Sequence, residues 1–179
     1  MTFEWFLFTA HLIQIRHGCN LHIFGRCAVV LVLYGIGIIK GARNADQVAA
    51  FPGRITIVNK KLRHHETPSF GVSNHLAGIL IQAHTINEAK TSIINIKPEI
   101  KNDKVDVEEL KALCEQLGYA FAQCEKGRII GSHTKLDVII DAGGYGWEPS
   151  LYILAHNPLE LIDRTHLLSA QIGGNLIAN

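Results

Sequence analysis

The sequence carries little charge and no clear excess of either sign. Charged residues make up 18% of the 179 residues, with 17 basic and 16 acidic side chains and a formal net charge of +1. Such a chain produces no long-range field that would attract nucleic acid or an anionic membrane surface, so we expect neither partner. Hydrophobic residues make up 47%, enough for a sizeable core, and we expect residues 1–179 to form a single domain.

The sequence also lacks a hydrophobic run long enough to span a membrane. The longest apolar run, Cys27 to Ile39, has 13 residues and contains two glycines, whereas a membrane-spanning helix needs ~20 residues. Glu4 stands where a cleavable signal peptide would carry basic residues. These features predict a cytoplasmic protein.

Cysteine is scarce, and no two cysteines have the CxxC spacing. The expected state is therefore that of free, buried thiols in a reducing compartment, at Cys19, Cys27, Cys114 and Cys124. The histidines and cysteines of residues 17–27 are spaced more loosely than the ligands of structural zinc sites. We expect no metal site.

The sequence does contain an alternation of strand-like and helix-like segments. A continuous apolar run at residues 27–33 is typical of a strand buried on both faces, as in parallel sheets. Residues 135–144 are expected to form a second buried strand that runs into a glycine turn. The remaining expected strands and helices follow in alternation, with strands at 54–62, 91–97 and 119–124 and helices at about 42–51, 106–117 and 148–155. This order predicts a Rossmann-like three-layer α/β sandwich with a mostly parallel central sheet.

The helix after Asp106 has the clearest local signals. Asp106 is a good N-cap, Glu109 follows three residues later, and Gly118 can end the helix in a left-handed conformation. By contrast, residues 1–25 are strongly apolar but have neither helical nor strand periodicity. They could form a helix or a strand, and they could hold the chain in a homo-oligomer.

A first candidate site follows the strand at 27–33. Gly35, Gly37 and Gly41 form a GxGxxxG pattern, one residue longer than the usual dinucleotide spacing. Glycines between a strand and a helix let the backbone approach a pyrophosphate at the helix N-terminus. The alternative is that these glycines are structural and simply continue the strand.

The end of the next expected strand bears on the cofactor. Dinucleotide-binding proteins that take NAD place an acid there, whereas basic residues favour the additional phosphate of NADP. Here the strand ends in Lys60 and Lys61, with no acid in position. The sequence therefore favours NADP over NAD, and the alternative is a solvated basic strand end.

The passage IIDAGGYGWEP is the second candidate site. Asp141 leaves a buried strand, and Glu148 could act as a second carboxylate. Gly143 and Gly144 follow Asp141 and would let the cofactor approach the backbone. His133 precedes the strand and could act as an acid or base if the fold brings it to Asp141. The alternative is a tight turn in which Asp141 binds backbone N–H groups.

These patterns rank three functions for a chain that binds a small-molecule ligand. The leading hypothesis is a nucleotide- or dinucleotide-binding protein, such as an NADP-linked oxidoreductase. The second is a hydrolase or sugar-processing enzyme that uses Asp141 and Glu148, with or without a divalent metal. The third is a non-enzymatic assembly or regulatory subunit.

Overall fold

The computed structural model describes most of the chain from residue 43 onward, together with a short strand before it. The described residues are 32–34, 43–53, 56–58, 61–63, 66, 69–98, 105–131 and 133–174. The apolar segment 1–25 and the GxGxxxG pattern at Gly35, Gly37 and Gly41 lie outside them.

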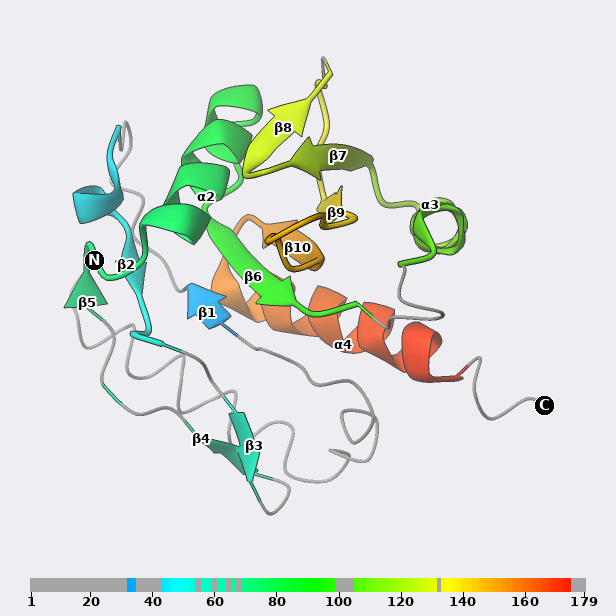
Figure 1. Cartoon of the computed structure of the whole chain (residues 1–179), viewed down its shortest axis with the longest axis horizontal. Helices are drawn as coiled ribbons and strands as arrows, with labels where there is room; N and C mark the ends of the chain where they lie inside the picture. Colours follow the sequence, from blue (N-terminus) through cyan, green and yellow to red (C-terminus); the bar gives the residue numbers. More distant parts are fainter. Residues whose placement is uncertain are drawn as a thin grey trace.

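The described strands form one large sheet and two small two-stranded sheets (Figure 1). The large sheet is built from β1 (Val32–Tyr34), β6 (Ser92–Ile96), β10 (Ser150–Ala155), β9 (Val138–Asp141), β7 (Phe121–Glu125) and β8 (Arg128–Ile130), in that spatial order. Within this sheet β7 and β9 are parallel, and the other neighbours are antiparallel. The small pairs are β2 (Ala49–Ala50) with β5 (Ser69–Phe70), and β3 (Thr56–Val58) with β4 (Lys61–Arg63).

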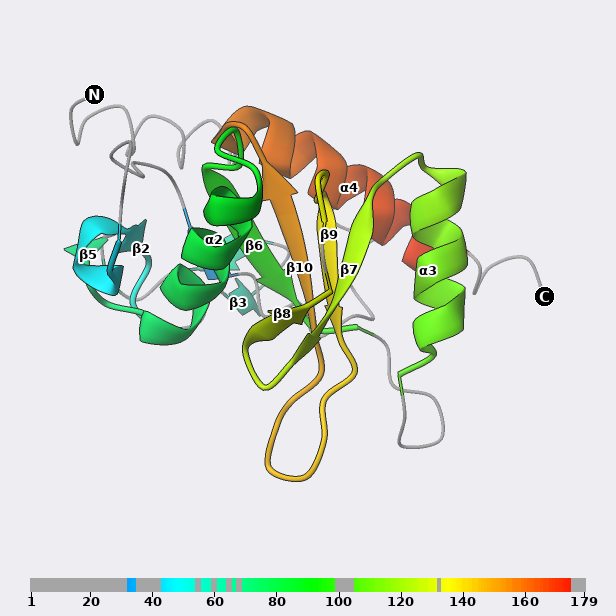
Figure 2. The same ribbon diagram turned by 90° about the horizontal axis from the view of Figure 1, so that it is seen from above.

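Helices cover both faces of the large sheet. Figure 2 shows α2 (Asn74–Ile86) on one face and α3 (Val107–Gln116) and α4 (Pro158–Gly174) on the other. Strand residues alternate between the two cores: Ile139, Tyr152 and Leu154 pack with α2, whereas their immediate neighbours pack with α3 and α4. Each buried Leu or Ile of this kind stabilises the fold by about 1.5–3 kcal/mol.

The prediction of a mixed α/β fold is confirmed, but the parallel Rossmann-like sandwich is wrong. Strands β9 and β10 are mostly apolar because helices cover both faces of the sheet, and every residue of the two strands is buried. An antiparallel sheet between two helical layers produces the same sequence pattern as a parallel one. The pattern of apolar residues therefore indicates that a strand is buried on both faces, but it does not indicate the direction of the strand.

Three expected elements also differ from the structure. The helix expected at 42–51 is instead a 3-10 turn, η2 (Ala45–Gln47), followed by β2. Within the strand expected at 54–62, the structure has two short strands, β3 and the beginning of β4, which pair antiparallel with each other. Most of the helix expected at 148–155 is strand β10. In the last case, an unbroken apolar run has no periodicity that separates a helix from a strand.

Several other elements agree with expectation. The strands expected at 91–97, 119–124 and 135–144 are present as β6, β7 and β9. The Asp106 side chain accepts a hydrogen bond from the Glu109 backbone N–H at 2.9 Å and caps α3. Gly118 follows α3 with φ +70, the left-handed conformation that ends many helices.

Candidate functional site

The loop between β9 and β10 is held in shape by the buried carboxylate of Asp141. Its Oδ1 accepts a hydrogen bond from the Gly143 backbone N–H, and its Oδ2 accepts one from Trp147 Nε1, both at 2.9 Å. The backbone groups of Gly144 and Trp147 pair with each other at 2.9 and 3.0 Å. The indole ring of Trp147 is therefore fixed at the base of the loop.

The loop requires glycine at one position and tolerates a side chain at another. Gly143 has φ +75, and a Cβ there would lie 2.7 Å from Pro149 N and 2.8 Å from Trp147 O. A Cβ on Gly144 would meet nothing within 4 Å. At the tip of the loop Tyr145 is fully exposed.

His75 lies in the first turn of α2, and its side chain contacts the β9–β10 loop and strand β10. Its Nε2 lies 2.8 Å from the hydroxyl of Tyr152, and its ring contacts Trp147 edge-on at 5.2 Å between centroids. Partial burial lowers the pKa of His75, and the negative charge of Asp141 offsets this only in part. The imidazole is therefore neutral at pH 7 and can exchange a proton with its neighbours.

The β7–β8 turn forms a third side of this arrangement. A Cβ on Gly127 would lie 3.5 Å from the His75 ring and 3.8 Å from the Trp147 ring. Gln82, on α2, holds the turn by donating to Gly127 O at 2.9 Å and accepting from Ile129 N at 3.2 Å. We call His75, Asp141, Trp147 and Tyr152 the His75 cluster; it lies where α2, the β7–β8 turn and the β9–β10 loop meet.

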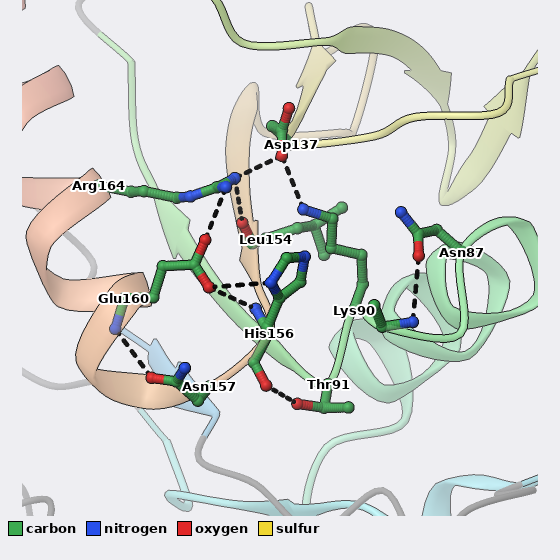
Figure 3. Close-up of polar contacts among 10 residues, drawn as sticks. Asn87, Lys90, Thr91, Asp137, Leu154, His156, Asn157, Glu160 and Arg164 are labelled. Carbon is green, nitrogen blue, oxygen red and sulfur yellow. Dashed lines mark hydrogen bonds and ion pairs between the residues drawn. The ribbon is translucent and has the colours of Figure 1, made fainter.

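A second polar group, the Asp137 network, lies at the opposite end of β9 (Figure 3). Asp137 accepts from Lys90 Nζ at 2.7 Å, from the Ala120 backbone N–H at 3.0 Å, and from Arg164. Arg164 also donates to the Leu154 carbonyl and pairs with Glu160. Lys90 is 2% exposed, so these contacts compensate a buried charge and have the character of a structural network.

The residues predicted from sequence fall in different places. Asp141, Gly143 and Gly144 lie in the β9–β10 loop, and Glu148 is an exposed residue of the same loop. His133 Nε2 lies 2.7 Å from the Ile130 carbonyl oxygen instead of contacting Asp141. The roles proposed for Asp141 and Glu148 stay predictions, and both oxygens of Asp141 already accept hydrogen bonds.

The predicted NADP site lies almost wholly outside the described residues. This is true of Gly35, Gly37, Gly41 and Lys60, and only the backbone of Lys61, in β4, is described. Gly143 and Gly144, which were also predicted to bind the cofactor, are described and lie in the β9–β10 loop. NADP binding by these residues stays a prediction. Among the described residues, no three His, Cys, Asp or Glu side chains gather as metal ligands would.

Sequence reasoning missed His75 and Tyr152. Their contact joins residues 77 positions apart, so no local pattern reports it. The one available signal was the position of His75 just after Ser73, at the beginning of a segment that could form a helix.

The chain is similar to proteins of thiamine phosphate synthesis. The sequence model of the family described as thiamine-phosphate synthase ThiN matches residues 35–166. Thiamine-phosphate synthase ThiN of Methanothermobacter thermautotrophicus is 22% identical over 138 residues, which cover 66% of this chain and 68% of that protein.

Two solved structures share the fold. The C-terminal domain of protein MJ0236 matches with a TM-score of 0.66 and 20% identity, over 94% of this chain and 93% of that one. The C-terminal domain of phosphomethylpyrimidine kinase matches with a TM-score of 0.60 and 20% identity, over 81% and 90% of the two chains. None of the helices among the described residues is long and apolar enough to cross a membrane.

Proposed function

The chain belongs to the family of thiamine-phosphate synthase ThiN, and from this premise we propose that it forms thiamine phosphate at the His75 cluster. The observation that carries the proposal is the extent of the family match. Residues 35–166 include every element that builds the cluster: α2, the β7–β8 turn and the β9–β10 loop.

Membership in this family corrects the function expected from sequence. The interpretation as a nucleotide-binding, NADP-linked oxidoreductase is wrong, because the family model and the curated relative both point to thiamine biosynthesis. The hydrolase and assembly-subunit alternatives are replaced by the same finding. The error arose from the glycine turns, which were interpreted within a parallel sheet that the protein does not have.

The chemistry of the product indicates what the site must do. Thiamine phosphate consists of a pyrimidine ring joined through a methylene carbon to the nitrogen of a thiazole ring. Forming that carbon–nitrogen bond displaces a leaving group from the methylene carbon, so the enzyme must align two flat rings and stabilise a departing anion.

The His75 cluster offers groups suited to both tasks. Trp147 is held rigidly by Asp141 at 2.9 Å and supplies a flat aromatic surface against which a heteroaromatic ring can pack. The N-terminus of the 13-residue helix α2 lies beside it, and helix N-termini stabilise anions through their free N–H groups and dipole. The neutral imidazole of His75, paired with Tyr152, can hold or pass a proton.

Replacing His75 tests this assignment. We expect the purified protein to form thiamine phosphate from its phosphorylated pyrimidine and thiazole halves, and His75→Gln to lower kcat/KM by about 10²–10⁴. Glutamine keeps polarity at this position but cannot exchange a proton near pH 7. Product formation is measured by chromatography, with unfolding curves to show that the variant is folded.

The matched control is His84→Gln, on the same helix. His84 lies near the other end of α2, where its Nδ1 is 3.1 Å from the Lys90 carbonyl oxygen. This variant should keep kcat/KM within a factor of about two of the wild type, since it lies outside the cluster. Absence of thiamine phosphate from wild-type reactions, or equal losses in the two variants, contradicts the proposal.

A further inference from the structure

Strand β6, which pairs with β10 beside the His75 cluster, carries a partly exposed asparagine, Asn95, whose side-chain oxygen is buried. Asn95 is the register partner of Tyr152 on β10. It shares a sheet face with Ile93, two residues earlier, which packs into the core beneath α2. Side chains of register partners on one face are neighbours, so Asn95 lies beside Tyr152, the residue whose hydroxyl His75 contacts.

Only one of the two polar atoms of the Asn95 carboxamide has a hydrogen-bond partner. Its Nδ2 donates to Ser150 Oγ at 3.3 Å, whereas its Oδ1 is buried and has no hydrogen-bond partner. Turning the amide over merely exchanges the two atoms, because the serine hydroxyl can accept or donate. One end of the carboxamide stays unpaired in either orientation.

An unpaired buried amide lowers stability, and its presence calls for an explanation. Among the described residues, three buried side-chain atoms lack a partner: Ser92 Oγ, Asn95 Oδ1 and Ser169 Oγ. A serine hydroxyl in a helix or strand is small and can turn toward backbone oxygens, whereas an asparagine amide is larger and has a fixed geometry. Of the three, Asn95 alone adjoins the His75 cluster.

We propose that Asn95 is a specificity-determining residue that recognises the amino-bearing edge of the pyrimidine ring. This inference rests on the proposed function. In thiamine the pyrimidine carries an amino group beside a ring nitrogen, so one edge presents an N–H donor next to an acceptor. A carboxamide complements such an edge with its own donor and acceptor, as asparagine does with adenine.

Asn95 is partly exposed, although its Oδ1 atom is buried. A ring that binds the amide must therefore displace the side chains that cover this oxygen. His75, at the exposed N-terminal end of α2, lies on the side from which we expect the ring to approach. Burial of the bound ring against Asn95 would exclude water from the new hydrogen bonds and strengthen them.

The experiment compares two ligands by isothermal titration calorimetry: thiamine phosphate and the analogue in which hydrogen replaces the pyrimidine amino group. Wild-type protein should prefer thiamine phosphate by at least about tenfold, since the analogue leaves the Asn95 amide unpaired. Asn95→Leu should reduce this preference to about one, by weakening the binding of thiamine phosphate alone. Asn95→Ala serves as a second variant should leucine not fit.

Ser92→Ala is the matched control. Ser92 lies on the same strand and also has a buried, unpaired side-chain oxygen, but it shares the opposite face with Ile94, toward α3 and α4. Its loss should leave the ligand preference unchanged. Unfolding curves should show that Asn95→Leu stays folded, because removal of the unpaired oxygen offsets the loss of the hydrogen bond to Ser150.

The outcomes separate this inference from the proposed function. If wild-type protein binds both ligands equally or binds neither, or if Asn95→Leu weakens both to the same extent, Asn95 does not read the amino group. Product formation by wild type with no effect of Asn95 on preference leaves the synthase activity standing and overturns this inference alone. A ligand preference that depends on Asn95, without product formation by the wild type, would overturn the proposed synthase activity and leave this inference standing.

Discussion

At the scale of single residues, the two cysteines that the structure describes are buried free thiols. Burial raises the pKa of Cys124 to about 12 and that of Cys114 to about 11, and nearby carboxylates add to the effect, Asp141 for Cys124 and Asp137 for Cys114. At pH 8 both side chains are therefore almost entirely in the thiol form, which reacts poorly with electrophiles.

Alkylation with iodoacetamide at pH 8 checks this directly. We expect peptides containing Cys114 and Cys124 to stay unlabelled in native protein and to be labelled fully in 6 M guanidinium, a common denaturing condition. Peptide mass spectrometry reports each site separately. Rapid labelling of Cys124 in the native state would show that the core beneath α2 is open to reagents.

Sequence reasoning at this scale succeeded where a residue's environment is local. The prediction of buried free thiols is confirmed for Cys114 and Cys124, because an apolar context along the chain indicates burial. The alternative interpretation of Asp141, as a residue that binds the backbone N–H groups of its own turn, is present in the structure. His75 escaped notice because its neighbours come from other elements, and a lone histidine has no pattern.

At the scale of elements, the β9–β10 loop depends on one glycine and is indifferent to the next. Gly143→Ala would force a Cβ to within 2.7 Å of Pro149 N at φ +75. Gly144→Ala adds a methyl group that meets nothing within 4 Å. Both substitutions add one methyl group, and the two positions are adjacent in sequence. A difference in stability between the two variants therefore reports the geometry of the loop and not the addition of a methyl group.

We expect Gly143→Ala to lower the free energy of unfolding by about 1–3 kcal/mol, because the residue is strained and its neighbours must move. Gly144→Ala should stay within about 0.5 kcal/mol of wild type. Urea denaturation measures both. Loss of stability in both variants, or in neither, would contradict the geometry described for the loop.

Element assignments from sequence were reliable where capping residues mark the ends. Helix α3 was predicted correctly because Asp106, Glu109 and Gly118 give local signals at both of its ends. Strand β10 was mistaken for a helix because Ser150–Ala155 is buried throughout and has no alternation. Its strand character comes from pairing with β6 and β9, and pairing partners cannot be found from one segment alone.

At the scale of the whole molecule, the Asp137 network joins segments that are far apart in sequence. Burial would raise the pKa of Asp137, but hydrogen bonds from Lys90, Arg164 and the Ala120 N–H outweigh it and lower the pKa to about 2. In the unfolded chain the pKa of this carboxyl group returns to its ordinary value of 3.8. The unfolded state therefore binds more protons between these values, and stability falls as pH falls through this window.

Asp137→Asn should lower the free energy of unfolding at pH 7 by about 3 kcal/mol, because it leaves the Lys90 ammonium buried without a counter-charge. The difference between variant and wild type should shrink as pH falls from about 4 toward 2, since wild-type Asp137 then becomes neutral as well. Urea denaturation across this pH range measures the difference. Asp163→Asn, at an exposed position on α4, is the control and should lie within about 0.5 kcal/mol of wild type; a pH-independent difference for Asp137→Asn would contradict the ionic assignment.

The order and direction of the strands could not be predicted from the sequence, for a physical reason. Burial of strands on both faces is recorded in the amino-acid pattern, and it was recognised at 135–144. Strand direction depends on which backbone groups pair, and side chains on a doubly covered strand carry little information about it. A hairpin such as β9–β10 was therefore interpreted as the beginning of a parallel unit, and the functional expectation followed from that error.

The Asp137 network also joins the two helical layers. Through one carboxylate, Lys90, which follows α2, is tied to Arg164 of α4, the helix on the opposite side of the sheet. The end of α2 nearest Lys90 is thus anchored to the layer that contains α4, whereas the other end, which carries His75, is held by contacts with Tyr152 and Trp147. The position of His75 therefore depends on attachments at both ends of one helix.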